Sequence, residues 1–192
     1  MPFDTNALDW IYPPPDAAVI SLWQSLHDAQ IESLAYDPAQ RRVQIVLRIA
    51  HIARFFEMGD QARWRLAFKE VTSLRACRFV PYCYELVLPE SATLEERSAI
   101  IDAHMAKGHY ESMDWLQVQA RLNRESTRIS DADLLLNSKN CAVRMRVCVE
   151  DEEFVDVVIC AAELAITMPD GGNGTPDDFL RLGKTYWENF SS

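Results

Sequence analysis

An adjacent imidazole and carboxylate, His27 and Asp28, are the first residues whose types can do chemistry together. A carboxylate beside an imidazole raises its basicity and fixes its tautomer, which a general base requires. Neighbours along a strand point to opposite faces, however, and an aspartate also caps helices and hydrogen bonds within turns. The pair is therefore a candidate functional site, and a structural role at a helix–strand junction is favoured over a catalytic one.

Two further histidines, His104 and His109, flank the end of an expected helix. Zinc-binding helices place their histidines at i and i+4 with a glutamate between them. Here the two histidines are five positions apart and Gly108 interrupts the helix. The sequence therefore predicts solvent-exposed histidines and no metal site.

The motifs of common catalytic sites do not occur in the sequence. There is no Gly-x-Ser-x-Gly for an acyl hydrolase and no Gly-x-x-x-x-Gly-Lys-[Ser/Thr] for a phosphate-binding loop. The glycine-rich run 171–174 precedes a helix, but Asp170, Asp177 and Asp178 surround it with negative charge, so a flexible loop is predicted there. We expect no cofactor, and the sequence favours a protein without catalytic activity.

Charge is distributed unevenly along the chain, whose formal net charge is −10. Residues 1–89 carry 10 acids and 9 bases, whereas residues 90–192 carry 19 acids and 10 bases. This balance argues against binding to nucleic acid, because such affinity comes from neutralising phosphates with lysine and arginine. It suits a basic protein partner, and the candidate acidic interaction surface is the run Glu150, Asp151, Glu152 and Glu153.

The cysteine pattern and the apolar runs predict a cytoplasmic protein. Five cysteines occur without any Cys-x-x-Cys, which speaks against a disulfide framework and a structural zinc site. The first residues carry no basic segment leading into an apolar stretch, so no secretion signal is visible. No apolar run reaches the roughly 18 residues that a membrane helix requires, so no membrane-spanning segment is expected.

The elements that position His27 and Asp28 begin with a short helix. Asp16 is its expected N-cap, and apolar residues follow at helical spacing, at Val19, Ile20, Trp23 and Leu26. A hairpin follows, with arms at 30–36 and 42–49 and a polar turn at 37–41. Further strands are expected at 63–70 and 82–88.

The second half of the chain continues the same pattern. The form Thr93-Leu94-Glu95-Glu96 is a capping box, so a helix is expected from there to Lys107. Residues 114–122 fit either the helical or the strand period, and we favour a strand. Strands are expected at 131–136, 142–149 and 154–167, with a turn at 150–153. A closing helix begins after Thr175 and Pro176.

These elements predict an α+β fold, with a mainly antiparallel, twisted sheet of six to nine strands, or a sandwich, and two or three packed helices. Residues 1–192 are expected to form one compact domain. A weak internal duplication, 27–88 and 130–168, is suggested because His27-Asp28-Ala29 and Ser130-Asp131-Ala132 both precede a strand, a polar turn and an arginine-bearing strand. Two hairpins that independently obey the same turn chemistry are the favoured explanation.

The expected core consists of positions at which period and bulk agree. They are Trp64, Leu66, Phe68, Val43, Ile45, Leu47, Val143, Met145, Val147, Phe179, Tyr186 and Phe190. If Trp64 and Phe68 were exposed, the strand register would be wrong, because a slip of one residue exchanges the two faces.

One stretch resembles a known group of sequences. Leu26-His27-Asp28-Ala29-Gln30-Ile31-Glu32-Ser33-Leu34, followed by the strand 42–47, resembles small bacterial proteins, some grouped as immunity proteins of polymorphic toxin systems, that carry Leu-His-Asp before a strand and a hairpin. The resemblance implies a nonenzymatic, β-rich cytoplasmic module and supplies no catalytic residues. We therefore expect a noncatalytic protein-binding module with an acidic surface. The alternative is a small-ligand-binding protein or enzyme with a pocket near His27 and Asp28.

Overall fold

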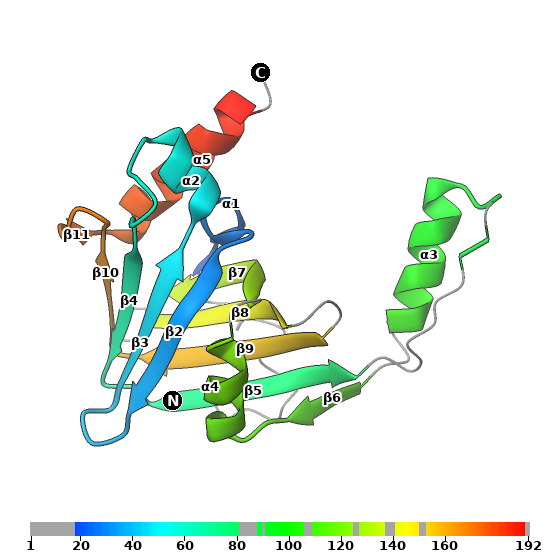
Figure 1. Ribbon diagram of the computed structural model, residues 1–192. Helices are drawn as coiled ribbons and strands as arrows, with labels where there is room; N and C mark the ends of the chain where they lie inside the picture. Colours follow the sequence, from blue (N-terminus) through cyan, green and yellow to red (C-terminus); the bar gives the residue numbers. More distant parts are fainter. Residues whose placement is uncertain are drawn as a thin grey trace.

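The computed structural model describes residues 18–80, 88–89, 91–105, 109–124, 127–136, 141–149 and 153–190. These residues form an α+β fold with an open antiparallel sheet of eleven strands and five helices. Figure 1 shows that β2, β3 and β4 cross the direction of β7, β8 and β9, so the sheet bends over on itself. The predicted fold class is confirmed, whereas the expected numbers of strands and helices are too low.

The strands are β1 (Ala18–Ser21), β2 (Gln30–Asp37), β3 (Arg42–Arg48), β4 (Trp64–Lys69), β5 (Ser73–Val80), β6 (His109–Ser112), β7 (Arg128–Leu136), β8 (Cys141–Val149), β9 (Glu153–Ala161), β10 (Glu163–Thr167) and β11 (Asn173–Gly174). The helices are α1 (Trp23–Leu26), α2 (Ala50–Phe55), α3 (Leu94–Met105), α4 (Trp115–Leu122) and α5 (Pro176–Phe190).

The strand order is symmetric about the contact between β2 and β7. It runs β11-β10-β4-β3-β2-β7-β8-β9-β5-β6, with β1 beside β7. The strands β2 to β5 thus mirror β7 to β10, and β2 meets β7 through the pair Gln30 and Arg128. Each of β2 and β7 also carries a register shift just after this pair. The predicted duplication aligns His27 with Ser130 in sequence, whereas the symmetric strand order places Gln30 opposite Arg128. The two alignments differ, so the duplication stays a prediction.

Two crossovers carry the chain from one half of the sheet to the other. After β4 the chain turns so that β5 pairs with β9, and after β9 it turns at Ala162 so that β10 pairs with β4. At these corners Thr72 N–H donates to the Cys160 carbonyl at 2.9 Å, and Ala162 N–H donates to the Lys69 carbonyl at 3.2 Å. The predicted strand 154–167 is therefore two strands, because its halves pair with different partners.

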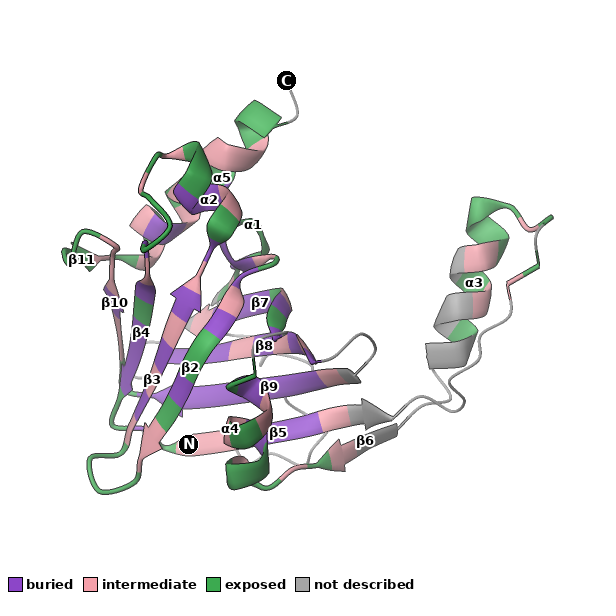
Figure 2. Ribbon diagram, viewed as in Figure 1, coloured by how far each residue is buried: buried purple, intermediate pink, exposed green. Residues whose placement is uncertain are grey.

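One hydrophobic core lies between the two halves of the sheet (Figure 2). Trp64 and Phe68 are fully buried, which confirms the register of β4. The predicted core residues of β3 and β8 are also fully buried, as is Phe179. The prediction is wrong for Phe190, which exposes 69% of its surface, and Tyr186 is only half-buried. Both of these lie on α5 at the rim of the core.

The predicted secondary structure is wrong for residues 18–21 and for residues 114–122. Residues 18–21 form β1 and pair with β7, so a tertiary pairing overrides the helical spacing, and only Trp23–Leu26 are helical. Residues 115–122 form α4, capped by Asp114, whose carboxylate accepts from Leu116 N–H at 2.9 Å. Val118 and Leu122 are buried while Leu116 is exposed, a pattern that only the helical period allows.

Of the other predicted elements, some are confirmed and some lie outside the described residues. The hairpin of β2 and β3 is confirmed, and its turn is held by the Asp37 carboxylate, which accepts from Ala39 and Gln40 N–H. The helix after Thr93 is confirmed as α3. The expected strand 82–88 lies almost wholly outside the described residues, as do residues 150–152 of the acidic run. Glu153 is the first residue of β9.

Candidate functional site

The helix α5 begins with a reciprocal cap and docks on α1 at very short range. Thr175 and Asp178 cap each other, because the Asp178 carboxylate accepts from Thr175 N–H at 3.0 Å and Asp178 N–H donates to the Thr175 hydroxyl at 3.1 Å. Further along, Gly183 faces the backbone of α1: a Cβ added there would lie 2.5 Å from the Gln24 carbonyl oxygen. Only glycine permits this approach.

Two hydrogen bonds fix this helix crossing. The buried Ser25 hydroxyl donates to the Phe179 carbonyl at 2.9 Å. The Trp187 indole N–H donates to the Gln24 carbonyl, also at 2.9 Å. The crossing therefore sets the position of the aromatic side chains in the last turns of α5.

A group of aromatic side chains from α1, α2 and α5 covers this end of the molecule. We call it the aromatic face, and it consists of Trp23, Phe55, Tyr186, Trp187 and Phe190. The Trp23 and Trp187 rings are stacked with centroids 5.1 Å apart, and the Tyr186 and Phe190 rings are stacked at 5.7 Å. Phe55 packs edge-on against Tyr186, also at 5.7 Å. The Trp187 and Phe190 rings, 5.7 Å apart, join these pairs, so ring contacts connect all five residues into one patch.

Three residues of the aromatic face are exposed to solvent although their side chains are large and apolar. Trp23 exposes 37% of its surface, Phe55 42% and Phe190 69%. Three of the six large apolar residues that are exposed in the described part of the chain thus lie in this one patch. Single exposed apolar residues are normal on a protein surface, but a contiguous group marks an interaction site.

His27 and Asp28 lie at the edge of the aromatic face. The His27 ring is 4.8 Å from the Trp23 ring and 6.3 Å from the Trp187 ring. His27 Nδ1 lies 3.3 Å from the Ser130 carbonyl oxygen, and Nε2 lies 3.6 Å from the Asp28 carboxylate. The Asp28 N–H donates to the Ile129 carbonyl at 2.9 Å. The pair therefore links the junction of α1 and β2 to β7, as its structural interpretation requires.

Asp28 has a left-handed backbone, with φ of 60°, which aspartate tolerates better than most residues. This conformation directs the chain from α1 into β2. It leaves 60% of the Asp28 side chain exposed beside the histidine.

His51 on α2 is the residue of this site that the sequence did not single out. Its ring packs on Tyr186 at 4.7 Å and lies 6.2 Å from the Trp187 ring. Its Nε2 atom is buried without a hydrogen-bond partner. Burial lowers the pKa of His51; the Asp28 carboxylate acts in the opposite direction and His27 adds to the lowering. His27, Asp28 and His51 therefore converge from two segments that are distant along the chain.

Two hollows of the described surface lie away from His27. One, of about 300 Å³, lies beside α2, where Arg48, Arg54, Glu57 and Asp60 line it. A second, of about 520 Å³, lies beside α3. Neither of these two is lined by His27 or Asp28. In the described residues, no group of three or more histidine, cysteine or acidic side chains is arranged to hold a metal ion.

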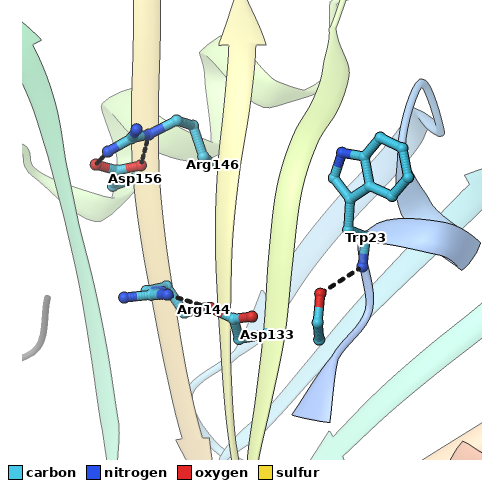
Figure 3. A network of polar contacts seen from close by, with 6 residues as sticks. Trp23, Asp133, Arg144, Arg146 and Asp156 are labelled. Carbon is cyan, nitrogen blue, oxygen red and sulfur yellow. Dashed lines mark hydrogen bonds and ion pairs between the residues drawn. The ribbon is translucent and has the colours of Figure 1, made fainter. Parts of the chain in front are cut away.

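The charged residues of β7, β8 and β9 form cross-strand ion pairs (Figure 3). Arg144 pairs with the largely buried Asp133, and Arg146 makes two bonds to the buried Asp156, at 2.8 and 3.0 Å. Beside them, burial and the Asp156 carboxylate together raise the pKa of the Cys77 thiol to about 12. The two buried carboxylates are thus each neutralised by an arginine of β8.

Comparison with protein-family models, curated proteins and solved structures gave no match. Among the described residues, none of the five helices combines the length and apolar character that crossing a membrane requires. The site must therefore be interpreted from its own geometry.

Proposed function

We propose that this protein is a noncatalytic protein-binding module, and that the aromatic face of α1, α2 and α5 binds a basic protein partner. The observation that carries the proposal is the continuous patch of five aromatic residues, of which Trp23, Phe55 and Phe190 are exposed and Tyr186 and Trp187 are partly buried. Rigid aromatic side chains are the most common energetic centres of protein interfaces, because they bury a large area with little loss of conformational entropy.

The charge of the chain supports a basic partner. A net charge of −10 steers cationic proteins toward the molecule and repels anionic ones. The alternative function, a ligand pocket at His27 and Asp28, has less support, because aromatic rings pack against His27 and the two hollows described above lie elsewhere.

The test is affinity capture from a lysate of the organism that encodes the protein, quantified by mass spectrometry. We expect a basic protein to be captured by the wild type, to be lost with Phe190→Ala and Phe55→Ala, and to be released by high salt. Leu116→Ala is the matched control, because Leu116 is exposed but lies on α4. Capture that is equal for all variants, or a partner that is not basic, would contradict the proposal.

A further inference from the structure

We infer that Asp28 is the anchor of the aromatic face, and that it binds a lysine or arginine side chain of the partner whose stem lies along the partly exposed indoles of Trp23 and Trp187. This inference rests on the proposed function and names the group that the site recognises. It depends on three features of the site: a carboxylate without a permanent cationic partner among the described residues, the nearby rings and the backbone geometry.

The first feature is that the Asp28 carboxylate has no permanent cation beside it. Its one ionic partner among the described residues is His27, at 3.6 Å, and a histidine is charged only when it is protonated. Some other surface acids, by contrast, have permanent partners: Glu32 pairs with Arg63, Glu163 with Lys69 and Asp178 with Arg181. Asp28 therefore offers a negative charge that an incoming cation can neutralise.

The second feature is the aromatic surroundings of this carboxylate. His27 contacts the Asp28 carboxylate, and the same imidazole lies near the rings of Trp23 and Trp187. Apolar ring surface covers the stem of a lysine or arginine, while a carboxylate pairs with its charged end. A carboxylate one imidazole away from two tryptophans thus matches both parts of such a side chain. An anionic side chain would meet the uncompensated charge of Asp28 and be repelled.

The third feature is the backbone of Asp28. Its left-handed conformation, φ of 60°, and the N–H bond to the Ile129 carbonyl fix the backbone at the end of α1 and with it the direction of the Cα–Cβ bond. A carboxylate on a fixed backbone loses less entropy when it binds than one on a mobile segment. Because asparagine also tolerates this conformation and has the same shape, Asp28→Asn removes the charge and keeps the fold.

The experiment measures binding of a peptide with four arginines and of its tetra-citrulline counterpart, which has the same shape without charge. Binding is followed by NMR, through the indole N–H signals of Trp23 and Trp187, which Trp→Phe variants assign. We expect the arginine peptide to shift both signals and the citrulline peptide to leave them unmoved. Asp28→Asn should weaken binding of the arginine peptide about tenfold.

Glu163→Gln is the matched control, because it removes the same charge from the exposed end of β10. Equal weakening by Asp28→Asn and Glu163→Gln would overturn the anchor role, since only net charge would then matter. Absence of binding by the wild type would also overturn it. If either result is found while capture of a basic protein still depends on Phe55 and Phe190, the anchor role fails and the proposed function stands. Failure of that capture overturns the proposed function, and the anchor role that rests on it falls as well.

Discussion

At the scale of single residues, His51, which packs on Tyr186 of the aromatic face, has a pKa that the fold shifts. Burial lowers its pKa, and the neighbours that face it are His27, Asp28 and Tyr186. When the pH falls below the ordinary histidine pKa of about 6.5, the unfolded chain takes up a proton at this position before the folded protein does. The free energy of unfolding therefore decreases as the pH falls from about 6.5 toward the lower pKa of the folded state.

We predict that His51→Gln reduces this pH dependence. Urea unfolding at a series of pH values between 7.5 and 5 should show a steeper loss of stability in the wild type than in the variant. The comparison concerns the slope, because the substitution itself changes stability at every pH. Parallel slopes would show that His51 titrates alike in the folded and unfolded states.

At the scale of elements, the docking of α5 on α1 depends on Gly183. A Cβ at this position would lie 2.5 Å from the Gln24 carbonyl oxygen and 2.5 Å from the Ser25 hydroxyl, and the first of these is backbone that cannot rotate away. We predict that Gly183→Ala lowers the free energy of unfolding by about 1–3 kcal/mol, although alanine is the better helix former. Urea denaturation measures the loss.

The adjacent substitution Lys184→Ala provides the control for this prediction. Lys184 is exposed, and its contact with Glu188 is a surface pair at 3.7 Å. Its removal should change the free energy of unfolding by no more than about 0.5 kcal/mol. If Gly183→Ala were as mild as Lys184→Ala, the close crossing of the two helices would be wrong.

The same scale shows how the free edge of β2 is protected. The side-chain amide of Asn123, at the end of α4, accepts from Leu34 N–H at 2.6 Å and donates to the Leu34 carbonyl at 3.1 Å. It thus occupies the backbone groups that a neighbouring strand would otherwise use. An edge closed in this way is less able to pair with another chain.

At the scale of the whole molecule, the two halves of the sheet share one core. Residues of β3 and residues of β8 belong to the same buried cluster. The crossovers also place β5 beside β9 and β10 beside β4. Each half of the sheet therefore includes a strand from the other half of the chain. We predict that both halves unfold in one cooperative step, because neither can bury its apolar face alone.

Native-state amide hydrogen exchange tests this prediction. The central amides of β3 and β8 should exchange with equal free energies, close to the global value from urea unfolding. The amides of α3 serve as the internal comparison, since this helix projects from the body and should exchange sooner (Figure 1). A clearly lower protection of one half would show that the symmetric strand order conceals two separate folding units.

Local patterns in the sequence determined much of this protein. The alternation in β3 and β4, the turn at Asp37 and the caps of α3 and α5 were all predicted, and the structure confirms them. These features depend on residues that are close together in sequence, so the necessary information is local. The burial of Trp64 and Phe68 followed for the same reason.

The tertiary structure alone decided two things: which secondary structure the ambiguous segments adopt, and which residues make up the site. Residues 18–21 became a strand because β7 offers an edge, and Leu122 became helical because the core accepts one face of α4. His27 and Asp28 were singled out from sequence, but His51 was not, because its partner ring, Tyr186, is distant along the chain. Phe190 was expected in the core, yet it lies on the surface because the end of α5 extends beyond the sheet. Contacts between distant segments, which no local period encodes, thus placed the aromatic rings of α5 beside His27.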